Sequence, residues 1–174
     1  APVSPAQVQI GDAEFGGAFT LTDHTGARVS SEELIDGPAL IYFGYTFCPD
    51  VCPVDVANMA RAVEFLDERG IAVTPVFITV DPARDTPESL AYYVDAMHPR
   101  MVGLTGSEAE IAAVAVKFRV YYRRVELEDS AAGYLMDHTT LTYLVTPEGV
   151  AAVFRNGYPP DEIARAVAEI LSRG

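Results

Sequence analysis

The stretch ALIYFGYTFCPDVCP, residues 39–53, carries the pattern that decides the fold. Residues 39–45 form a nearly continuous apolar run, which is typical of a strand buried on both faces of a parallel sheet. Residues 53–69 follow with apolar side chains at helical spacing, and Gly70 ends that pattern. The sequence therefore predicts a buried strand that leads into an amphipathic helix, with two cysteines at the junction.

Buried strands and amphipathic helices continue to alternate after this unit. Residues 71–80 read as a second buried strand, and Thr86 and Ser107 have the residue types and spacing of helix N-caps. The other expected elements are a hairpin over 18–29, a short helix after Ser30, a hairpin over 120–136, strands over 141–145 and 150–154, and a helix over 161–171. This order predicts an α/β domain of thioredoxin-like type. Its mixed central sheet would be flanked by helices, with an N-terminal β-hairpin and an extra β-hairpin before the strand at 141.

Length and composition favour one compact domain. The chain has 174 residues, of which 49% are hydrophobic and 21% charged, so a disordered chain is excluded. We expect residues 1–14 to be a lead-in segment and residues 15–174 to form a single thioredoxin-like domain. No run approaches the roughly 20 apolar residues of a membrane helix, and no signal peptide is visible at the start.

The net charge of −13 limits the kinds of molecule that this protein is expected to bind. A phosphate backbone selects basic surfaces, so nucleic-acid binding is disfavoured, and docking on an anionic membrane surface is disfavoured for the same reason. A solubilising surface charge is the simpler interpretation of the acidic excess, and an acidic face for a basic protein partner is the alternative.

Cys48 and Cys52 are the only cysteines, and they follow a buried strand, where ligands gather in open α/β sheets. A helix N-terminus lowers the pKa of a thiol, whereas the charge of Asp50 between them opposes that effect. If both cysteines lie in the first helical turn, their Cα atoms are about 6 Å apart along the helix axis, a separation that a disulfide tolerates. A static disulfide, a thiol–disulfide redox pair and a thiolate metal site all remain open, and metal binding is favoured.

A histidine is the expected third ligand. Zinc usually takes four protein ligands, whereas copper(I) accepts two thiolates and one imidazole. His138 directly precedes the strand at 141–145. If that strand is antiparallel to the strand at 39–45, His138 lies at the same sheet edge as the cysteines. His24 in a hairpin turn and His98 at a helix end are weaker candidates.

Two neighbours of His138 have the chemistry to support a metal site. Asp137 is either a carboxylate that orients the imidazole ring or a solvated surface charge. Met136 offers a soft sulfur as an axial ligand, although a core or hairpin-facing position is favoured for it.

The loop at 80–87 follows the second buried strand and is expected at the same edge. We predict that Arg84 forms an ion pair with Asp81 or Asp85 and so shapes this loop. Docking of a partner protein is the alternative role for Arg84.

Four elements of the sequence together resemble the SCO/SenC family of copper-binding cytochrome c oxidase assembly proteins. They are YFGYTFCPDVCP at 42–53, VDPARDTP at 80–87, GLTG at 103–106, and Asp137-His138-Thr139 followed by Tyr143-Leu144. The resemblance covers residues 15–172. It implies a thioredoxin-like fold and copper bound by Cys48, Cys52 and His138. Thioredoxins carry a cis-proline that blocks metal binding before the equivalent of the strand at 141, where this chain has threonines.

The resemblance also implies a cellular setting. Members of the family have an N-terminal membrane tether. We expect the domain on the periplasmic side of a bacterial membrane, with the mitochondrial intermembrane space as the less favoured location.

The expected function is that of a copper metallochaperone for the CuA site of cytochrome c oxidase subunit II. It would act as a monomer, receive copper from a donor chaperone, and be gated by a Cys48–Cys52 disulfide. One alternative is a thiol–disulfide oxidoreductase that reduces the CuA cysteines, which needs Cys48 and Cys52 but not His138. Whether the protein is also an enzyme therefore stays open. A redox or copper sensor is a further alternative, and a peroxidase is weaker because no separate peroxidatic cysteine is present.

Overall fold

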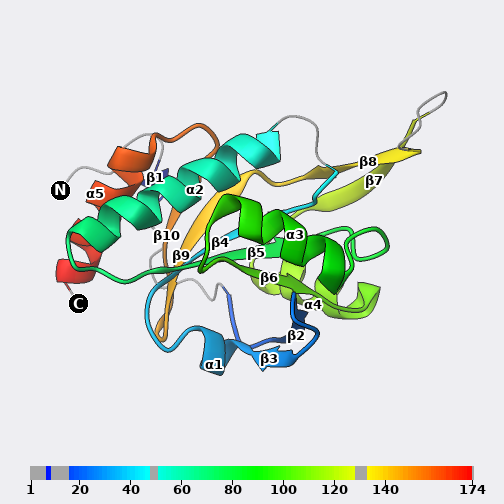
Figure 1. Cartoon of the computed structure of the whole chain (residues 1–174), viewed down its shortest axis with the longest axis horizontal. Helices are drawn as coiled ribbons and strands as arrows, with labels where there is room; N and C mark the ends of the chain where they lie inside the picture. The colour runs from blue at the N-terminus through cyan, green and yellow to red at the C-terminus, as the bar shows by residue number, and fades with distance from the viewer. Residues whose placement is uncertain (1–6, 9–15, 48–50, 128–132, 174) are drawn as a thin grey trace.

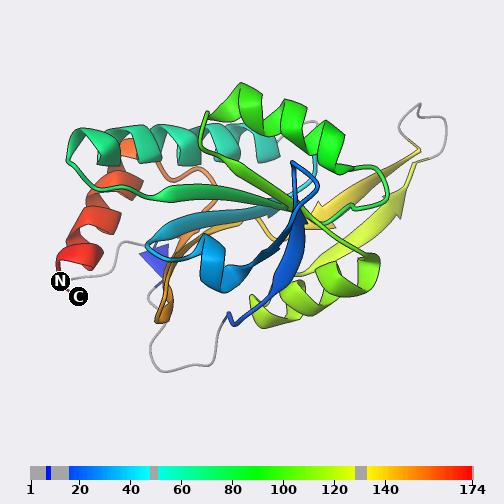
Figure 2. The same ribbon diagram turned by 60° about the horizontal axis from the view of Figure 1, so that its bottom comes forward.

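The computed structural model describes residues 7–8, 16–47, 51–127 and 133–173. In this part of the chain an eight-stranded mixed sheet has the order β1-β10-β9-β4-β5-β6-β2-β3, and β7 and β8 form a separate two-stranded sheet. Figures 1 and 2 show helices on both faces of the large sheet, with α2 and α3 on one face and α4 on the other. This arrangement agrees with the predicted mixed α/β architecture.

The strands are β1 (Gln7–Val8), β2 (Thr20–Asp23), β3 (Arg28–Ser30), β4 (Ala39–Gly44), β5 (Thr74–Thr79), β6 (Val102–Thr105), β7 (Tyr122–Glu126), β8 (Tyr134–His138), β9 (Leu141–Thr146) and β10 (Gly149–Arg155). The helices are α1 (Ser31–Leu34), α2 (Val51–Glu68), α3 (Pro87–Met97), α4 (Glu108–Lys117) and α5 (Pro160–Ser172).

The central strand β4 is the expected buried strand. All six of its residues are buried, and it pairs parallel with β5 and antiparallel with β9. Helix α2 begins at Val51, two residues before the predicted start, so Pro53 lies in its first turn. A proline is tolerated there because the first N–H groups of a helix have no intrahelical acceptor. The strand–helix unit predicted from residues 39–69 is thus confirmed.

Helix starts were predicted from capping residues, and these predictions are confirmed. The Ser107 hydroxyl accepts from the Glu110 N–H at 3.1 Å, and the Glu110 carboxylate accepts from the Ser107 N–H at 3.0 Å. Thr86 caps α3 through the Ser89 N–H, and Ser30 caps α1 in the same way. Side-chain caps act within one turn, which is why the sequence alone locates them.

Strand β6 is an element that the sequence analysis missed. It pairs parallel with β5 and antiparallel with β2. Gly103 obscures it, because glycine is depleted from strands. The reason for the glycine is packing: a Cβ there would lie 3.1 Å from a Val94 methyl and 3.2 Å from the Leu90 Cβ, both on α3.

The N-terminal segment also differs from expectation. Gln7–Val8 pairs antiparallel with β10 and extends the sheet, although only a lead-in segment was predicted there. Among the described residues, no helix is both long and apolar enough to cross a membrane.

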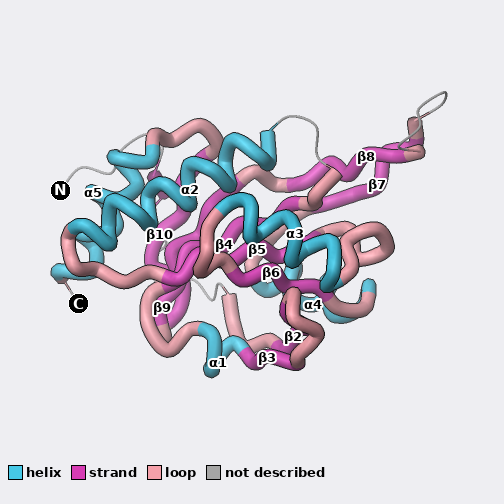
Figure 3. The backbone as a smooth tube through the Cα atoms, viewed as in Figure 1, coloured by secondary structure: helices cyan, strands magenta, loops and turns pink. Residues whose placement is uncertain are grey.

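The second expected hairpin is present as β7 and β8. These strands pair with each other in register, so that Tyr122 lies opposite His138. Figures 1 and 3 show that this hairpin projects from one end of the sheet, near the start of α2. His138 is its last strand residue, and two residues connect it to β9.

Candidate metal centre

His138 lies at the edge of the sheet where the chain leaves β4. Its ring is edge-on to those of Tyr42 and Tyr45, with centroid distances of 6.2 and 5.7 Å. The antiparallel pairing of β4 with β9 explains this position, because it brings the start of β9 beside the end of β4. The condition set by the sequence analysis for His138 is therefore met.

The cysteines are only partly described. Cys52 is the second residue of α2 and so belongs to its first turn. Cys48 and Asp50 lie outside the described residues, as does the side chain of Cys52. Among the residues that are described, no three His, Cys, Asp or Glu side chains gather to hold a metal ion. The described parts of the predicted site are thus the His138 ring and the backbone of the first turn of α2.

The His138 ring is held in an orientation that suits a metal ligand. Its Nδ1 lies 3.0 Å from the Thr139 carbonyl oxygen, which can only accept a hydrogen bond. In the tautomer with the proton on Nδ1, the ring donates to this carbonyl and has its lone pair on Nε2. Metal-binding histidines commonly donate their other N–H to a carbonyl in this way. An imidazole Nε2 together with thiolates is a donor set that copper(I) accepts.

The two neighbours of His138 have separate roles. Asp137 points away from the ring because successive strand residues face opposite sides. Its side chain is 58% exposed and lies 3.7 Å from Arg123 Nε. The Thr139 carbonyl, rather than Asp137, contacts the imidazole. Met136 is partly buried and packs against the hydrophobic core, which is the position favoured for it from the sequence.

The other two histidines accept structural hydrogen bonds away from this edge. His24 Nδ1 accepts from the Gly103 N–H at 3.2 Å, which joins the β2–β3 turn to β6. His98 ends α3, is buried, and accepts from the Arg100 N–H at 3.0 Å. Burial lowers the pKa of His98, and the nearby Arg100 cation lowers it further.

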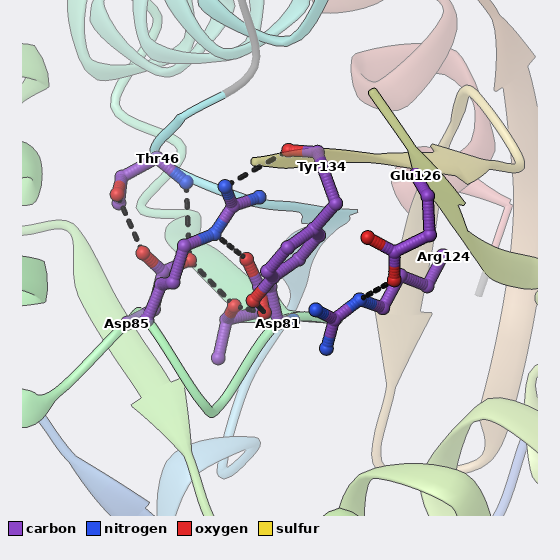
Figure 4. Close-up of polar contacts among 8 residues, drawn as sticks. Thr46, Asp81, Asp85, Arg124, Glu126 and Tyr134 are labelled. Atoms are coloured by element: carbon purple, nitrogen blue, oxygen red, sulfur yellow. Dashed lines mark hydrogen bonds and ion pairs between the residues drawn. The ribbon is translucent and has the colours of Figure 1, made fainter. Parts of the chain in front are cut away.

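The loop after β5 reaches the same edge, as predicted. Arg84 Nε donates to Asp81 Oδ2 at 2.5 Å, so the expected ion pair forms with Asp81 rather than with Asp85. Asp81 is 3% exposed, and its Oδ1 accepts from the Tyr134 hydroxyl at 2.8 Å (Figure 4). Tyr134 belongs to β8, the strand that ends in His138. The loop is therefore in direct contact with the histidine-bearing hairpin.

Asp85 has a structural role that the sequence analysis did not assign. Its fully buried carboxylate accepts from the Thr46 N–H at 3.0 Å, the Thr46 hydroxyl at 2.5 Å and the Thr79 hydroxyl at 2.7 Å (Figure 4). Its backbone carbonyl accepts from the Thr105 hydroxyl at 3.2 Å. Asp85 thus joins the ends of β5 and β6 to the chain two residues before Cys48. Only its position just before the α3 N-cap Thr86 could have suggested this role.

Burial sets the acidity of Asp85. Desolvation, the largest effect, raises its pKa above the usual value, although the hydrogen bonds from Thr46 and Thr79 lower it. The charge of Asp81 contributes to the increase. The protonated form is therefore favoured more strongly in the folded chain than in the unfolded chain.

This shift predicts a pH dependence of stability. A carboxyl with a raised folded-state pKa binds more protons when folded, so the free energy of unfolding falls as pH rises above the unfolded value of about 3.9. Asp85→Asn removes this titration. We expect the unfolding free energy of the wild type minus that of Asp85→Asn, from urea melts, to decrease between pH 4 and pH 7. Two parallel pH curves would contradict the raised pKa.

Comparison with known proteins adds independent observations. A family model described as SCO1/SenC matches residues 7–172. Protein SenC of Rhodobacter capsulatus is 46% identical over 160 residues, which cover 91% of this chain and 72% of that protein.

Solved structures share the fold. Arabidopsis thaliana ScoI with copper bound has a TM-score of 0.88 at 39% identity, with 92% of this chain and 99% of that chain covered. BsSco is described as a member of the Sco family of cytochrome c oxidase assembly proteins in which a disulfide switch was identified. It has a TM-score of 0.72 at 27% identity, with 95% of this chain and 98% of that chain covered. These neighbours confirm the thioredoxin-like fold class.

Proposed function

Because this chain belongs to the SCO1/SenC family, we propose that it is a copper metallochaperone for cytochrome c oxidase assembly. Its acceptor would be the CuA site of subunit II. The observation that carries the proposal is the position of His138, which lies against Tyr45 at the edge from which the Cys48–Cys52 segment departs. The copper-bound ScoI structure, at 39% identity, supports copper as the cargo.

The proposed ligands are the thiolates of Cys48 and Cys52 and the Nε2 atom of His138. Two soft sulfurs and one imidazole select copper(I) over harder cations, and this set leaves room for an incoming thiolate from the acceptor. The same two thiols would form a disulfide on oxidation, so copper binding and disulfide formation exclude each other. The disulfide switch named for BsSco supports such a gate.

The proposed location is the periplasmic side of a bacterial membrane, with an N-terminal tether in the full-length protein. The bacterial SenC relative supports this assignment. A homologue from human mitochondria, 41% identical over 165 residues, keeps the intermembrane space as the alternative.

His138→Ala is expected to weaken copper(I) binding by the reduced protein by about two orders of magnitude, because one of three ligands is lost at about 3 kcal/mol for each ligand. The measurement is competition against a chromophoric copper(I) chelator under anaerobic conditions. His24→Asn is the matched control, because it removes an imidazole away from the site and keeps an acceptor for the Gly103 N–H. We expect its affinity to equal that of the wild type.

A parallel assay separates the chaperone from the thiol–disulfide oxidoreductase. The His138→Ala protein is given an oxidised CuA domain, and free thiols on that domain are counted. Unchanged copper(I) affinity together with efficient reduction of the CuA disulfide would overturn the chaperone proposal in favour of the reductase. A weakened copper(I) affinity of His138→Ala supports the chaperone proposal.

A further inference from the structure

The strand that carries His138 is not hydrogen-bonded into the main sheet. Within the described residues, β7 and β8 pair only with each other, whereas the strand that leads to Cys48 is central to the eight-stranded sheet. The two-residue connection to β9 fixes only one end of β8. The connection from α4 to β7 holds the same end of the hairpin, so the position of its remaining length depends on side-chain contacts.

Arg84 makes contacts with both parts of the proposed site. Its Nη1 donates to the Tyr134 carbonyl at 2.9 Å, and its Cζ lies 3.6 Å from the centre of the Tyr134 ring. The same Cζ lies 4.7 Å from the centre of the Phe47 ring. Phe47 immediately precedes Cys48 in the sequence, and Tyr134 lies on the same face of β8 as His138 because four residues separate them. Arg84 thus lies between Phe47 and the histidine strand.

The surroundings of Arg84 make these contacts strong. Its side chain is 15% exposed, and the Asp81 carboxylate that pairs with it is 3% exposed. Cation–π and ionic contacts gain strength when they are shielded from water. Asp81 also accepts from the Tyr134 hydroxyl, so the ion pair holds both ends of the tyrosine residue.

We propose that Arg84 is a positioning residue that sets the spacing between the His138 strand and the chain at Phe47, the residue that precedes Cys48. This inference rests on the proposed copper site. The planar guanidinium can stack on Tyr134 and Phe47 while it donates to Asp81 and to the Tyr134 carbonyl. A lysine ammonium keeps the charge, but it is not planar and does not present several N–H donors in a fixed forked arrangement. Arg84→Lys should therefore lose the positioning while the net charge is unchanged.

The first test compares Arg84→Lys with the wild type in copper(I) competition titrations. Changes in residues that orient a metal ligand typically cost 10- to 100-fold in affinity, and we expect a loss in that range. Arg124→Lys is the matched control. The Arg124 Cζ lies 3.7 Å from the centre of the same Tyr134 ring, but its ion pair with Glu126 stays within the hairpin and is exposed. We expect Arg124→Lys to bind copper(I) as the wild type does.

A double-mutant cycle distinguishes positioning from general stabilisation. If Arg84 acts by placing His138, then Arg84→Lys should cost almost nothing further in the His138→Ala background. Additive losses in the double variant would overturn the inference, and so would an Arg84→Lys protein with wild-type affinity. Unchanged affinity in His138→Ala alone would instead overturn the proposed copper site, so the two failures are distinguishable.

A copper-free measurement completes the test. In reduced, metal-free Arg84→Lys we expect the backbone amides of β7 and β8 to exchange hydrogen faster than in the wild type, whereas those of α2 remain unchanged. This pattern follows if the side chain holds the hairpin against the sheet. Equal exchange in the hairpin would overturn the inference, as would an equal increase throughout the chain.

Discussion

Full oxidation of the Cys48–Cys52 pair is expected to weaken copper(I) binding by about four orders of magnitude. Tetrahedral zinc sites in small peptides provide about 10–16 kcal/mol from four ligands, or about 3 kcal/mol for each ligand. A disulfide removes two thiolate ligands at once. The resulting loss of about 6 kcal/mol corresponds to about 10⁴-fold in affinity. His138 alone would then remain from the proposed set.

The measurement is a copper(I) competition titration on reduced and on air-oxidised protein, with free thiols counted in each sample. The Cys48→Ser/Cys52→Ser double variant is the control, because it should bind weakly whether or not oxidant has been added. Reduction of the oxidised wild type should restore its affinity. Undiminished binding by protein without free thiols would refute a site built on two thiolates.

Asp85→Ala is expected to destabilise the fold by about 3 kcal/mol. The substitution removes the acceptor for three hydrogen bonds and leaves the Thr46 N–H and the buried Thr79 hydroxyl without that partner. Polar groups left unsatisfied in the interior typically cost about 1–3 kcal/mol each. Relief of the desolvation that raises the pKa of Asp85 offsets part of that cost.

Urea denaturation of the reduced protein measures this effect. Asp95→Ala is a suitable control, because Asp95 is an exposed carboxylate on α3 and its loss should change stability by about 0.5 kcal/mol or less. Equal stabilities for the two variants would mean that the Asp85 hydrogen bonds contribute nothing net. We expect Asp85→Asn to be milder than Asp85→Ala, because the amide can still accept from the Thr46 N–H.

The candidate site was predictable to different degrees. His138 could be placed because its position follows from one condition, the antiparallel pairing of two strands recognisable in the sequence. The hydrogen-bond partner of its ring could not be predicted, because that partner is the backbone carbonyl of Thr139, and every residue type has a backbone carbonyl. Asp137 had the better chemistry for that role, but strand alternation directs it to solvent beside Arg123.

Local patterns in the sequence determined the elements: the buried run of β4, the amphipathic α2, the capped starts of α3 and α4, and the two hairpins. Each depends on residues within about one turn or one strand of each other. Tertiary structure alone decided the rest, namely strand β6 under α3, Asp85 between three strand ends, and Arg84 between Phe47 and Tyr134. The contacts of Asp85 with Thr46 and Thr105, and of Arg84 with Phe47 and Tyr134, join residues 20 to 50 positions apart. Their energies arise from burial and from geometry, which exist only once the chain has folded.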